Sequence, residues 1–321
     1  MKNWKWTTYF GFFLSIIGMI LMIIFAFNRA FNDGSGVLNA NLASNFGDFI
    51  GGLVGPIFSL AGILFLYETI MLQKETFAIQ HLENRFFELI RYHRENVFQM
   101  EHKIPSEEDK TANGIRVFIE MKKQFEELFD FVSQQSFPHL QNTKFEDEIE
   151  RHNINIAYLI FYFGVGVGTV TTLSKHLKKK YPAELIDILL SDLRNRKSKY
   201  GDTVYFGGHQ IRLAHYFRHL FHTVKFINDN KNVNFVQKFE YIQILRAQFS
   251  IYEIAIFFFH SLSDLGESWE KRKYVSNYGL IRNLPPEFTK EINPEKYYKI
   301  KYQYDTDKRF GECHFEKHKD N

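Results

Sequence analysis

Residues 47–73, GDFIGGLVGPIFSLAGILFLYETIMLQ, decide the fold because they form a helix-length apolar segment. No charged side chain occurs between Phe49 and Tyr67, and a helix that crosses a bilayer needs about 20 apolar residues. Small residues recur at every fourth position: Gly47, Gly51, Gly55 and Ser59. This small-residue face would let another helix approach closely. We expect a membrane helix that packs either on a second protomer or on Gly11 and Gly18 of the same chain.

A second apolar stretch lies at residues 6–27, WTTYFGFFLSIIGMILMIIFAF. It is longer than the roughly 7–15 apolar residues of a signal peptide, so we expect a retained transmembrane helix. The two segments predict a transmembrane hairpin over residues 1–72, with spans at about 6–27 and 48–71.

Positive charges flank this hairpin on its outer ends. Lys2 and Lys5 precede the first span and Lys74 follows the second, whereas residues 28–45 between the spans contain only Arg29 and Asp33 as charges. The positive-inside rule therefore predicts a multi-pass protein of the cytoplasmic membrane with both termini in the cytoplasm.

The composition limits the possible chemistry of the soluble part. A formal net charge of +3 over 321 residues is too small to indicate a nucleic-acid-binding protein. One cysteine, Cys313, allows no internal disulfide and no multi-cysteine metal cluster. The glycine run at residues 164–168 lacks the spacing and the βαβ context of a dinucleotide fingerprint. The sequence predicts no cofactor.

The rest of the chain predicts a mainly α protein. Residues 73–100 continue the second span as a helix. Leu72, Ile79, Phe86 and His93 are spaced seven residues apart, which fits either a stalk-like coiled coil or an amphipathic helix that packs on its own domain. Residues 101–275 are expected to form a helical cytoplasmic domain and residues 276–321 an irregular tail.

Several helices are expected within that domain, at residues 107 or 114–135, 182–199, 209–229 and 234–265. The apolar segment at residues 154–173 fits either a third span or a buried helix followed by a glycine-rich break. We favour the buried helix because the segment contains Asn155, three Gly and three Thr.

The helix at residues 209–229 carries a polar stripe beside its apolar face. The stripe contains Arg212, His215, His219 and His222, with Arg218 beside it. Histidines at this spacing can bind a metal or a phosphate, or can be hydrogen-bonded structural groups. We predict no metal ion, because such a helix seldom binds one without a nearby carboxylate or further histidine.

The following apolar segment carries three polar residues seven apart, namely Arg246, Glu253 and His260. A buried charge is costly unless it is paired, so we expect Glu253 to contact Arg212, Arg218 or a histidine of the preceding helix. This network would either fix the helix register or form a site.

Arg212 and His219 also resemble the Arg-x4–6-His motif of HEPN-type ribonucleases. In that family two such helices pair in a dimer. The resemblance implies that Arg212 would stabilise the phosphate charge and that His219 would act as the general acid or base.

Four blocks together resemble one family, the phage abortive infection proteins of AbiC type. They are GDFIGGLVGPIFSLAGILFLYETIMLQKETF at 47–77, FFELIRYHRENV at 86–97, GHQIRLAHYFRHLFHTVKFI at 208–227 and KFEYIQILRAQFSIYEIAIFFFHSL at 238–262. The resemblance implies a bacterial membrane-anchored defence protein that stops phage propagation at the expense of the host cell. It implies no active site.

Three functions are consistent with these observations. The first is a non-enzymatic effector or sensor that forms homo-oligomers in the lipid bilayer and responds to a phage-derived trigger or a host protein. The second is a membrane-tethered HEPN-like ribonuclease, and the third is a scaffold that recruits a partner effector to the membrane.

Overall fold

The computed structural model describes residues 6–27, 40–104, 110–135, 146–166, 168–195, 207–290 and 292–303. Within these ranges the chain is mainly helical, as expected, and its strands are β1 (Glu101–Lys103) and β2 (Thr111–Asn113), which pair antiparallel. The chain divides into two compact units at residues 1–84 and 85–321.

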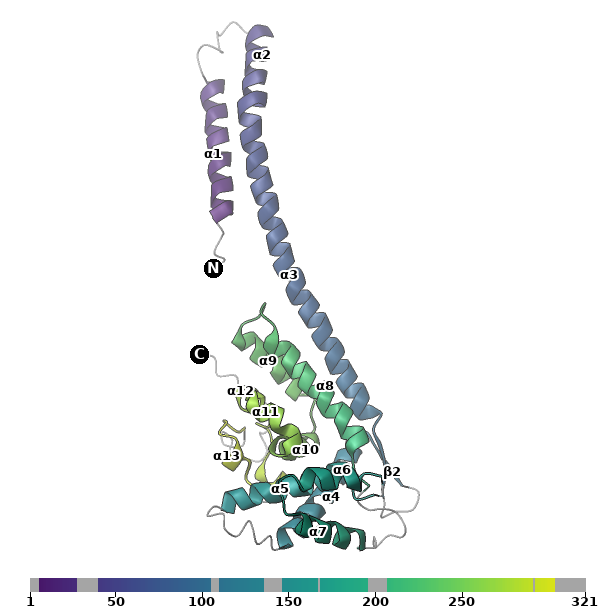
Figure 1. Ribbon diagram of the computed structural model, residues 1–321. Coiled ribbons are helices and arrows are strands. Elements are labelled where there is room, and N and C mark those ends of the chain that lie inside the picture. The colour runs from purple at the N-terminus through teal and green to yellow at the C-terminus, as the bar shows by residue number, and fades with distance from the viewer. Residues whose placement is uncertain are drawn as a thin grey trace. The chain divides into compact units, whose positions relative to one another are not determined.

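The first unit contains α1 (Trp6–Ala26), α2 (Ala40–Phe49), a π-helical turn (Ile50–Val54) and the first part of α3 (Gly55–Phe98). Figure 1 shows α1 running alongside α2 and the start of α3. Two helical stretches in the described chain are long and apolar enough to cross a membrane, residues 6–24 and residues 44–98. The structure thus provides the two membrane-length helices that the sequence predicts.

Pro56 explains the π-helical turn at the start of α3. A proline inside a helix has no amide hydrogen, and its ring collides with the carbonyl group four residues earlier. The wider π-helical turn just before Pro56 relieves this conflict, and there the Gly55 amide donates to the carbonyl of Ile50, five residues back. The helix therefore continues through the proline instead of ending at it.

The second unit begins with the last turns of α3 and contains all the remaining elements. They are α4 (Ile115–Gln134), α5 (Glu146–Phe163), α6 (Val170–Leu177), α7 (Ala183–Asn195), α8 (Gln210–Asp229), α9 (Phe235–Arg246), α10 (Ile251–Leu262), α11 (Glu267–Lys271), α12 (Tyr274–Tyr278) and α13 (Pro294–Tyr297), with 3₁₀ turns at Asp264–Gly266 and Pro286–Phe288. Its core is formed where α4, α5 and α10 pack on one another.

Aromatic side chains fill this core. The rings of Phe125 on α4 and Phe259 on α10 stack with their centroids 4.0 Å apart, and Phe161 of α5 meets Phe125 edge to face. The high phenylalanine content of the chain is therefore used in packing the second unit as well as in apolar helices of the first.

Helix α5 settles the nature of the apolar segment at residues 154–173. Its side chains from Asn153 to Phe161 are buried in the domain, and the helix ends at Phe163. The buried helix followed by a glycine-rich break is confirmed, and α5 is not among the membrane-length helices of the described chain.

The prediction of a single helix at residues 234–265 is wrong. The structure has two helices, α9 and α10, which together are long and apolar enough for one span but are bent by 118° relative to each other. The sequence S-I-Y-E at residues 250–253 explains the break. The Ser250 side chain accepts from the Glu253 amide, and the Glu253 side chain accepts from the Ser250 amide, which is a capping box that starts a new helix.

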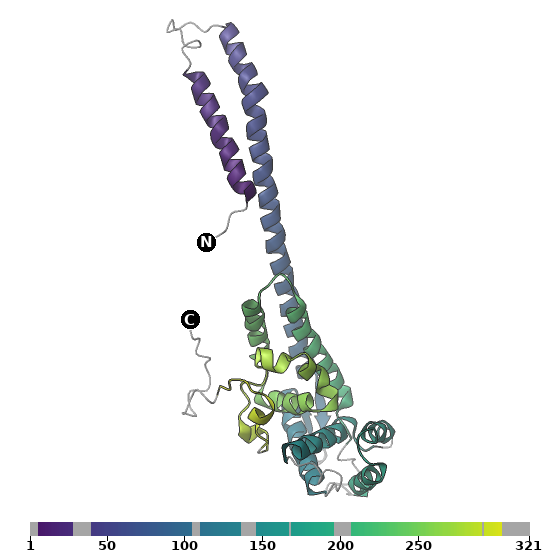
Figure 2. The ribbon, with the colours of Figure 1, turned by 60° about the vertical axis from the view of Figure 1, so that its left-hand side comes forward.

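The last turns of α3 pack on the second unit itself. Phe86 meets Tyr241 edge to face at 5.2 Å, and the His93 ring lies 5.0 Å from that of Tyr216. In Figures 1 and 2 this end of α3 runs beside α8. Residues 85–98 thus behave as an amphipathic helix on their own domain, which was the alternative to a coiled coil.

The described part of the expected C-terminal tail also contributes to the domain. Leu280, Ile281 and Leu284 are fully buried, as is Tyr302. The backbone here is irregular with short helices, yet its apolar side chains are part of the core.

Candidate functional site

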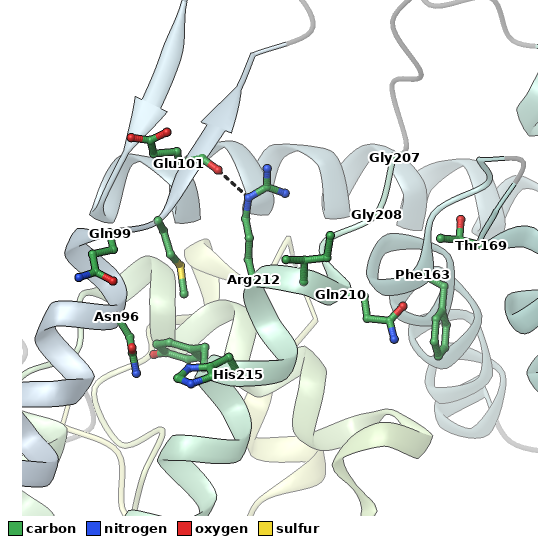
Figure 3. A pocket seen from close by; sticks show the side chains of 13 residues that line it. Asn96, Gln99, Glu101, Phe163, Thr169, Gly207, Gly208, Gln210, Arg212 and His215 are labelled. Atoms are coloured by element: carbon green, nitrogen blue, oxygen red, sulfur yellow. Dashed lines mark hydrogen bonds between the residues drawn. The ribbon is translucent and has the colours of Figure 1, made fainter.

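A pocket of about 460 Å³ opens where the end of α3, strand β1 and the start of α8 meet. We call it the Arg212 pocket. Figure 3 shows Asn96 of α3 and Gln99, just after this helix, on one side. Arg212 and His215 of α8 lie in the centre, and Gln210, Phe163 and Thr169 lie on the other side. More of its lining side chains are polar than apolar, although Met100, Phe163 and Ile211 also contribute.

A close crossing of two backbones places α8 at this pocket. Gly164 and Gly208 both have positive φ angles, 76° and 84°, which glycine adopts without strain. A Cβ at Gly164 would lie 2.5 Å from the Gly207 carbonyl carbon, so no side chain fits there. The crossing lets the His209 amide donate to the carbonyl of Tyr162 at 2.9 Å and so joins the start of α8 to the end of α5.

Arg212 is the main cation of this pocket. Its Nε donates a 2.6 Å hydrogen bond to the carbonyl oxygen of Glu101, drawn as a dashed line in Figure 3. Burial lowers the pKa of Arg212 from its usual value. Within the described chain no further hydrogen bond of Arg212 occurs, so the terminal nitrogens of the guanidinium can bind an anion or a carbonyl group.

Two histidines that the sequence analysis did not select lie behind Arg212, joined by an amide. The His209 Nε2 donates to Gln124 Oε1 at 2.7 Å, and the Gln124 Nε2 donates to His102 Nε2 at 3.0 Å. Burial lowers the pKa of His102 to about 4, with a contribution from Arg212. Burial also lowers the pKa of His209 well below its usual value.

The lowered pKa values keep both imidazoles neutral near pH 7. The order of donors and acceptors along these two hydrogen bonds then fixes the tautomer of each ring. A sequence signal for this network is lacking, because its members come from β1, α4 and the residue before α8.

The polar stripe predicted on α8 is divided among three environments. His215 lines the Arg212 pocket, and His222 is exposed. His219 lies outside the pocket lining; both of its ring nitrogens are buried without a hydrogen-bond partner, and its ring is 6.0 Å from that of His93. The structure therefore separates the surroundings of Arg212 from those of His219, the two residues of the ribonuclease hypothesis.

The prediction that Glu253 contacts Arg212, Arg218 or a histidine of the preceding helix is wrong. Its Oε1 accepts from the hydroxyl of Tyr216 at 3.0 Å, and its Oε2 accepts from the amide and the hydroxyl of Ser250, both at 2.8 Å. The reason is the capping box, which fixes the carboxylate at the first turn of α10 and leaves neutral donors to satisfy it.

The other members of the predicted polar cluster lie apart. Arg246 is buried at the end of α9, where its Nη1 donates to the carbonyl of Gly279 at 3.1 Å. The His260 Nδ1 lies 3.1 Å from the Tyr158 hydroxyl, and its ring stacks on Phe217 at 3.8 Å. Arg218 is exposed. Among the residues that the structure describes, no group of three His, Cys, Asp or Glu side chains is placed to hold a metal ion.

The small-residue face, Gly47, Gly51, Gly55 and Ser59, is not the surface that contacts α1. Instead, Gly11 and Gly18 of α1 lie against rings of α3, since a Cβ on them would be 3.0 Å from Phe65 and 3.1 Å from Phe58. Gly47 and Gly51 have nothing within 4 Å of such a Cβ. Packing of the small-residue face on Gly11 and Gly18 is therefore not observed.

The Arg212 pocket presents several groups that can form hydrogen bonds to a bound molecule. It offers a guanidinium, an imidazole, side-chain amides and a tyrosine, which can together bind a carbonyl or anionic group. Among the residues that the structure describes, its lining includes the hydroxyl of Thr169 and one carboxylate, that of Glu101, but no serine or cysteine.

Comparison with known protein families gives a match over part of the chain. Residues 208–289 match the model of the family described as "Putative phage abortive infection protein", and this segment runs from the start of α8 to the 3₁₀ turn at Pro286–Phe288. No curated protein and no solved structure matches the chain. The match indicates a function in phage abortive infection, and it includes Arg212 and His215 of the pocket.

Proposed function

We propose that the protein is a membrane-anchored effector or sensor of phage abortive infection that acts by assembly of its membrane helices, without a catalytic step. The observation that carries the proposal is the presence, in one chain, of two membrane-length helices and a helical segment that matches the abortive infection family. Both termini lie in the cytoplasm, and the second unit receives the infection signal there.

The surface of the first unit supports assembly. α1 exposes large apolar side chains along its length, including Phe13, Ile16 and Ile24. Lipid can cover such side chains, whereas Gly47 and Gly51 leave open space in which another helix can approach closely. A second copy of the chain is the partner, because the same helix then supplies both sides of the contact.

Substitution of the open glycines tests this mechanism. Gly47→Leu with Gly51→Leu adds bulk where the isolated chain has free space, so the hairpin is retained while close approach of a second copy is blocked. We expect the higher-order species in crosslinked membranes to disappear and plaque formation on the protected host to rise at least about tenfold.

Two matched variants separate assembly from folding. Leu60→Phe adds volume at another exposed position of α3 and should leave oligomers and protection unchanged. Gly18→Leu directs its side chain at Phe58 and should reduce the amount of membrane-inserted protein. Retention of oligomers and protection in the Gly47/Gly51 double variant would rule out this mechanism.

The outcome of infection separates the three functions. For the proposed membrane effector, we expect infected cells to lose their membrane potential before they lose RNA. Degraded RNA with an intact potential would instead indicate a nuclease, and protection that requires a second copurifying effector would indicate a scaffold.

A further inference from the structure

A second and larger pocket shares Glu101 with the Arg212 pocket. It has a volume of about 1060 Å³ and is formed by the last turns of α3, the turn after β2, the start of α4 and residues just before and at the start of α10. This volume matches that of sites for small organic molecules. We call it the His93 pocket.

The walls of the His93 pocket are apolar. Phe87, Ile90, Val97 and Phe98 come from α3, and Ile115 comes from α4. Phe87, Phe98 and Ile115 each expose more than half of their surface, with Phe98 at 82%. Large apolar side chains exposed together around a concavity commonly mark a place where another molecule binds.

Cations lie at the same pocket. Arg91, Arg94 and Arg116 line it. Arg91 is 3.6 Å from Glu95 on the next turn, but Arg94 and Arg116 form no ion pair or hydrogen bond with any described residue. Three carboxylates also line the pocket, those of Glu95, Glu101 and Glu253. Glu95 pairs with Arg91 and Glu253 accepts from Tyr216 and Ser250, and none of the three is within ion-pair distance of Arg94 or Arg116. The pocket therefore combines two free guanidinium groups with apolar walls.

His93 adds a buried polar side chain without a hydrogen-bond partner to this pocket. Its side chain is only 2% exposed, yet neither Nδ1 nor Nε2 has a hydrogen-bond partner. Its Nε2 lies 3.8 Å from Glu253 Oε1, which is too long for a hydrogen bond. A buried polar group without a partner costs free energy, and His93 lines the pocket, where a ligand can supply the partner.

We propose that the His93 pocket binds a small organic anion with an apolar body, whose acidic group is held by Arg94 and Arg116 and whose further polar atom bonds to His93. The apolar body lies on Phe98 and Ile115. The site is independent of membrane assembly, because all of its lining residues belong to the second unit.

Titration calorimetry of the full-length protein in an uncharged detergent tests this site, with empty micelles as the blank. The probe is 1-naphthyl phosphate, which has an aromatic body and one phosphate group. Inorganic phosphate lacks the apolar body, and 1-naphthol lacks the charge. We expect 1-naphthyl phosphate to bind at least tenfold more tightly than either. Dihexanoyl phosphatidic acid carries the same chemistry on a lipid, and tighter binding of this compound would identify lipid as the source.

Variants assign the binding to the pocket. Arg94→Gln with Arg116→Gln should weaken binding of 1-naphthyl phosphate at least tenfold, whereas Arg85→Gln with Arg272→Gln, outside the lining, removes the same charge and should change it less than twofold. His93→Phe keeps an aromatic ring against Tyr216 and Phe249 but removes both nitrogens. It should weaken binding without lowering the unfolding temperature.

Three results would overturn the proposal. They are no binding of 1-naphthyl phosphate or of the short-chain lipid at millimolar concentration, equal affinity for inorganic phosphate, and unchanged affinity in the Arg94/Arg116 variant. A His93→Phe variant that binds as well as the wild type would remove His93 from the site and leave its buried nitrogens unexplained by a ligand.

Discussion

Helices α1 and α10 are both strongly apolar, yet their surroundings differ completely. α1 (Trp6–Ala26) exposes large apolar side chains such as Phe13, at 56%, and Ile16, at 57%. In α10 (Ile251–Leu262) every side chain from Glu253 onward is buried by other helices. A helix that is apolar on all sides needs either lipid or a protein core around it. Length separates the two cases, since 21 residues reach across a bilayer and 12 do not.

The comparison also shows how polar groups are tolerated in apolar helices. α10 contains Glu253 and His260, each satisfied by a hydrogen bond from another part of the second unit. In the first unit the Thr7 hydroxyl of α1 donates to Glu68 of α3 at 2.9 Å. Protein neighbours can thus replace water for a buried polar group, provided that they supply the correct donors and acceptors.

The largest effect on the contrast between α1 and α10 is expected from reversing the charge of Glu253 in α10. Glu253→Lys places an ammonium beside the Tyr216 and Ser250 donors and should lower the free energy of unfolding by about 4–5 kcal/mol. Urea unfolding of the full-length protein in detergent, followed by near-ultraviolet circular dichroism, measures the change. Glu267→Lys at an exposed site of α11 is the control, and an equal effect in both would mean that Glu253 is not buried as described.

A second test makes the same substitution in both helices. Phe259→Ala removes a ring that stacks on Phe125 and should lower the free energy of unfolding of the domain by about 3–4 kcal/mol. Phe13→Ala, at an exposed position of α1, should change it by less than about 0.5 kcal/mol. The contrast between α1 and α10 fails if the two variants unfold at the same urea concentration.

Acid should weaken the protein core, where imidazoles are held neutral. Burial lowers the pKa of His260 to about 3, whereas the unfolded chain binds protons below about pH 6.5. Its stabilising contribution is therefore complete above about pH 6.5 and is lost as the pH falls toward 3. Between pH 7 and pH 5 this histidine alone should reduce the free energy of unfolding by about 2 kcal/mol.

The histidine variant identifies the source of that loss. His260→Phe retains stacking on Phe217 and removes the titrating ring, so the decrease in stability between pH 7 and pH 5 should be smaller by about 2 kcal/mol than in the wild type. His102 and His209, whose pKa values are also lowered, should account for part of the remainder. An identical pH profile in the variant would show that His260 is not neutral in the fold.

The smallest expected effect concerns the bend that separates α10 from α9. Ser250→Ala removes the side-chain cap and one donor to Glu253 and should cost about 1 kcal/mol. Asn234→Ala removes the equivalent cap of α9, where Asn234 and Gln237 form the other capping box, and gives a matched comparison. A stabilised Ser250→Ala variant would indicate that α9 and α10 prefer to form one continuous helix.

Much of the helical fold could be predicted from spacing along the chain. α8 begins and ends within one residue of the expected positions 209–229, and the break after α5 follows from the glycines at residues 164–168. The bend before α10 could also be predicted, because the sequence S-I-Y-E at residues 250–253 is a capping box. The apolar residues on both sides of it favour a continuous helix and make this prediction harder.

The candidate sites were less predictable. Arg212 and His215 were selected from their spacing on α8 and do line a pocket. His102, Gln124 and His209 come from separate elements and carry no shared pattern, so their hydrogen-bond chain could not be inferred. His93 was visible only as a polar member of a seven-residue row, whereas its unsatisfied nitrogens depend on what folds around it.

The sequence by itself determined the local properties of this protein, namely two membrane-length apolar helices, a mainly helical second unit and the positions of most helix ends. These follow from hydrophobic periodicity and from capping and breaking residues, which act within a few positions along the chain. Only the tertiary structure decided that Glu253 bonds to Tyr216 and that the small-residue face lies away from α1. Those outcomes depend on side chains far apart in sequence, whose meeting is set by the packing of whole helices.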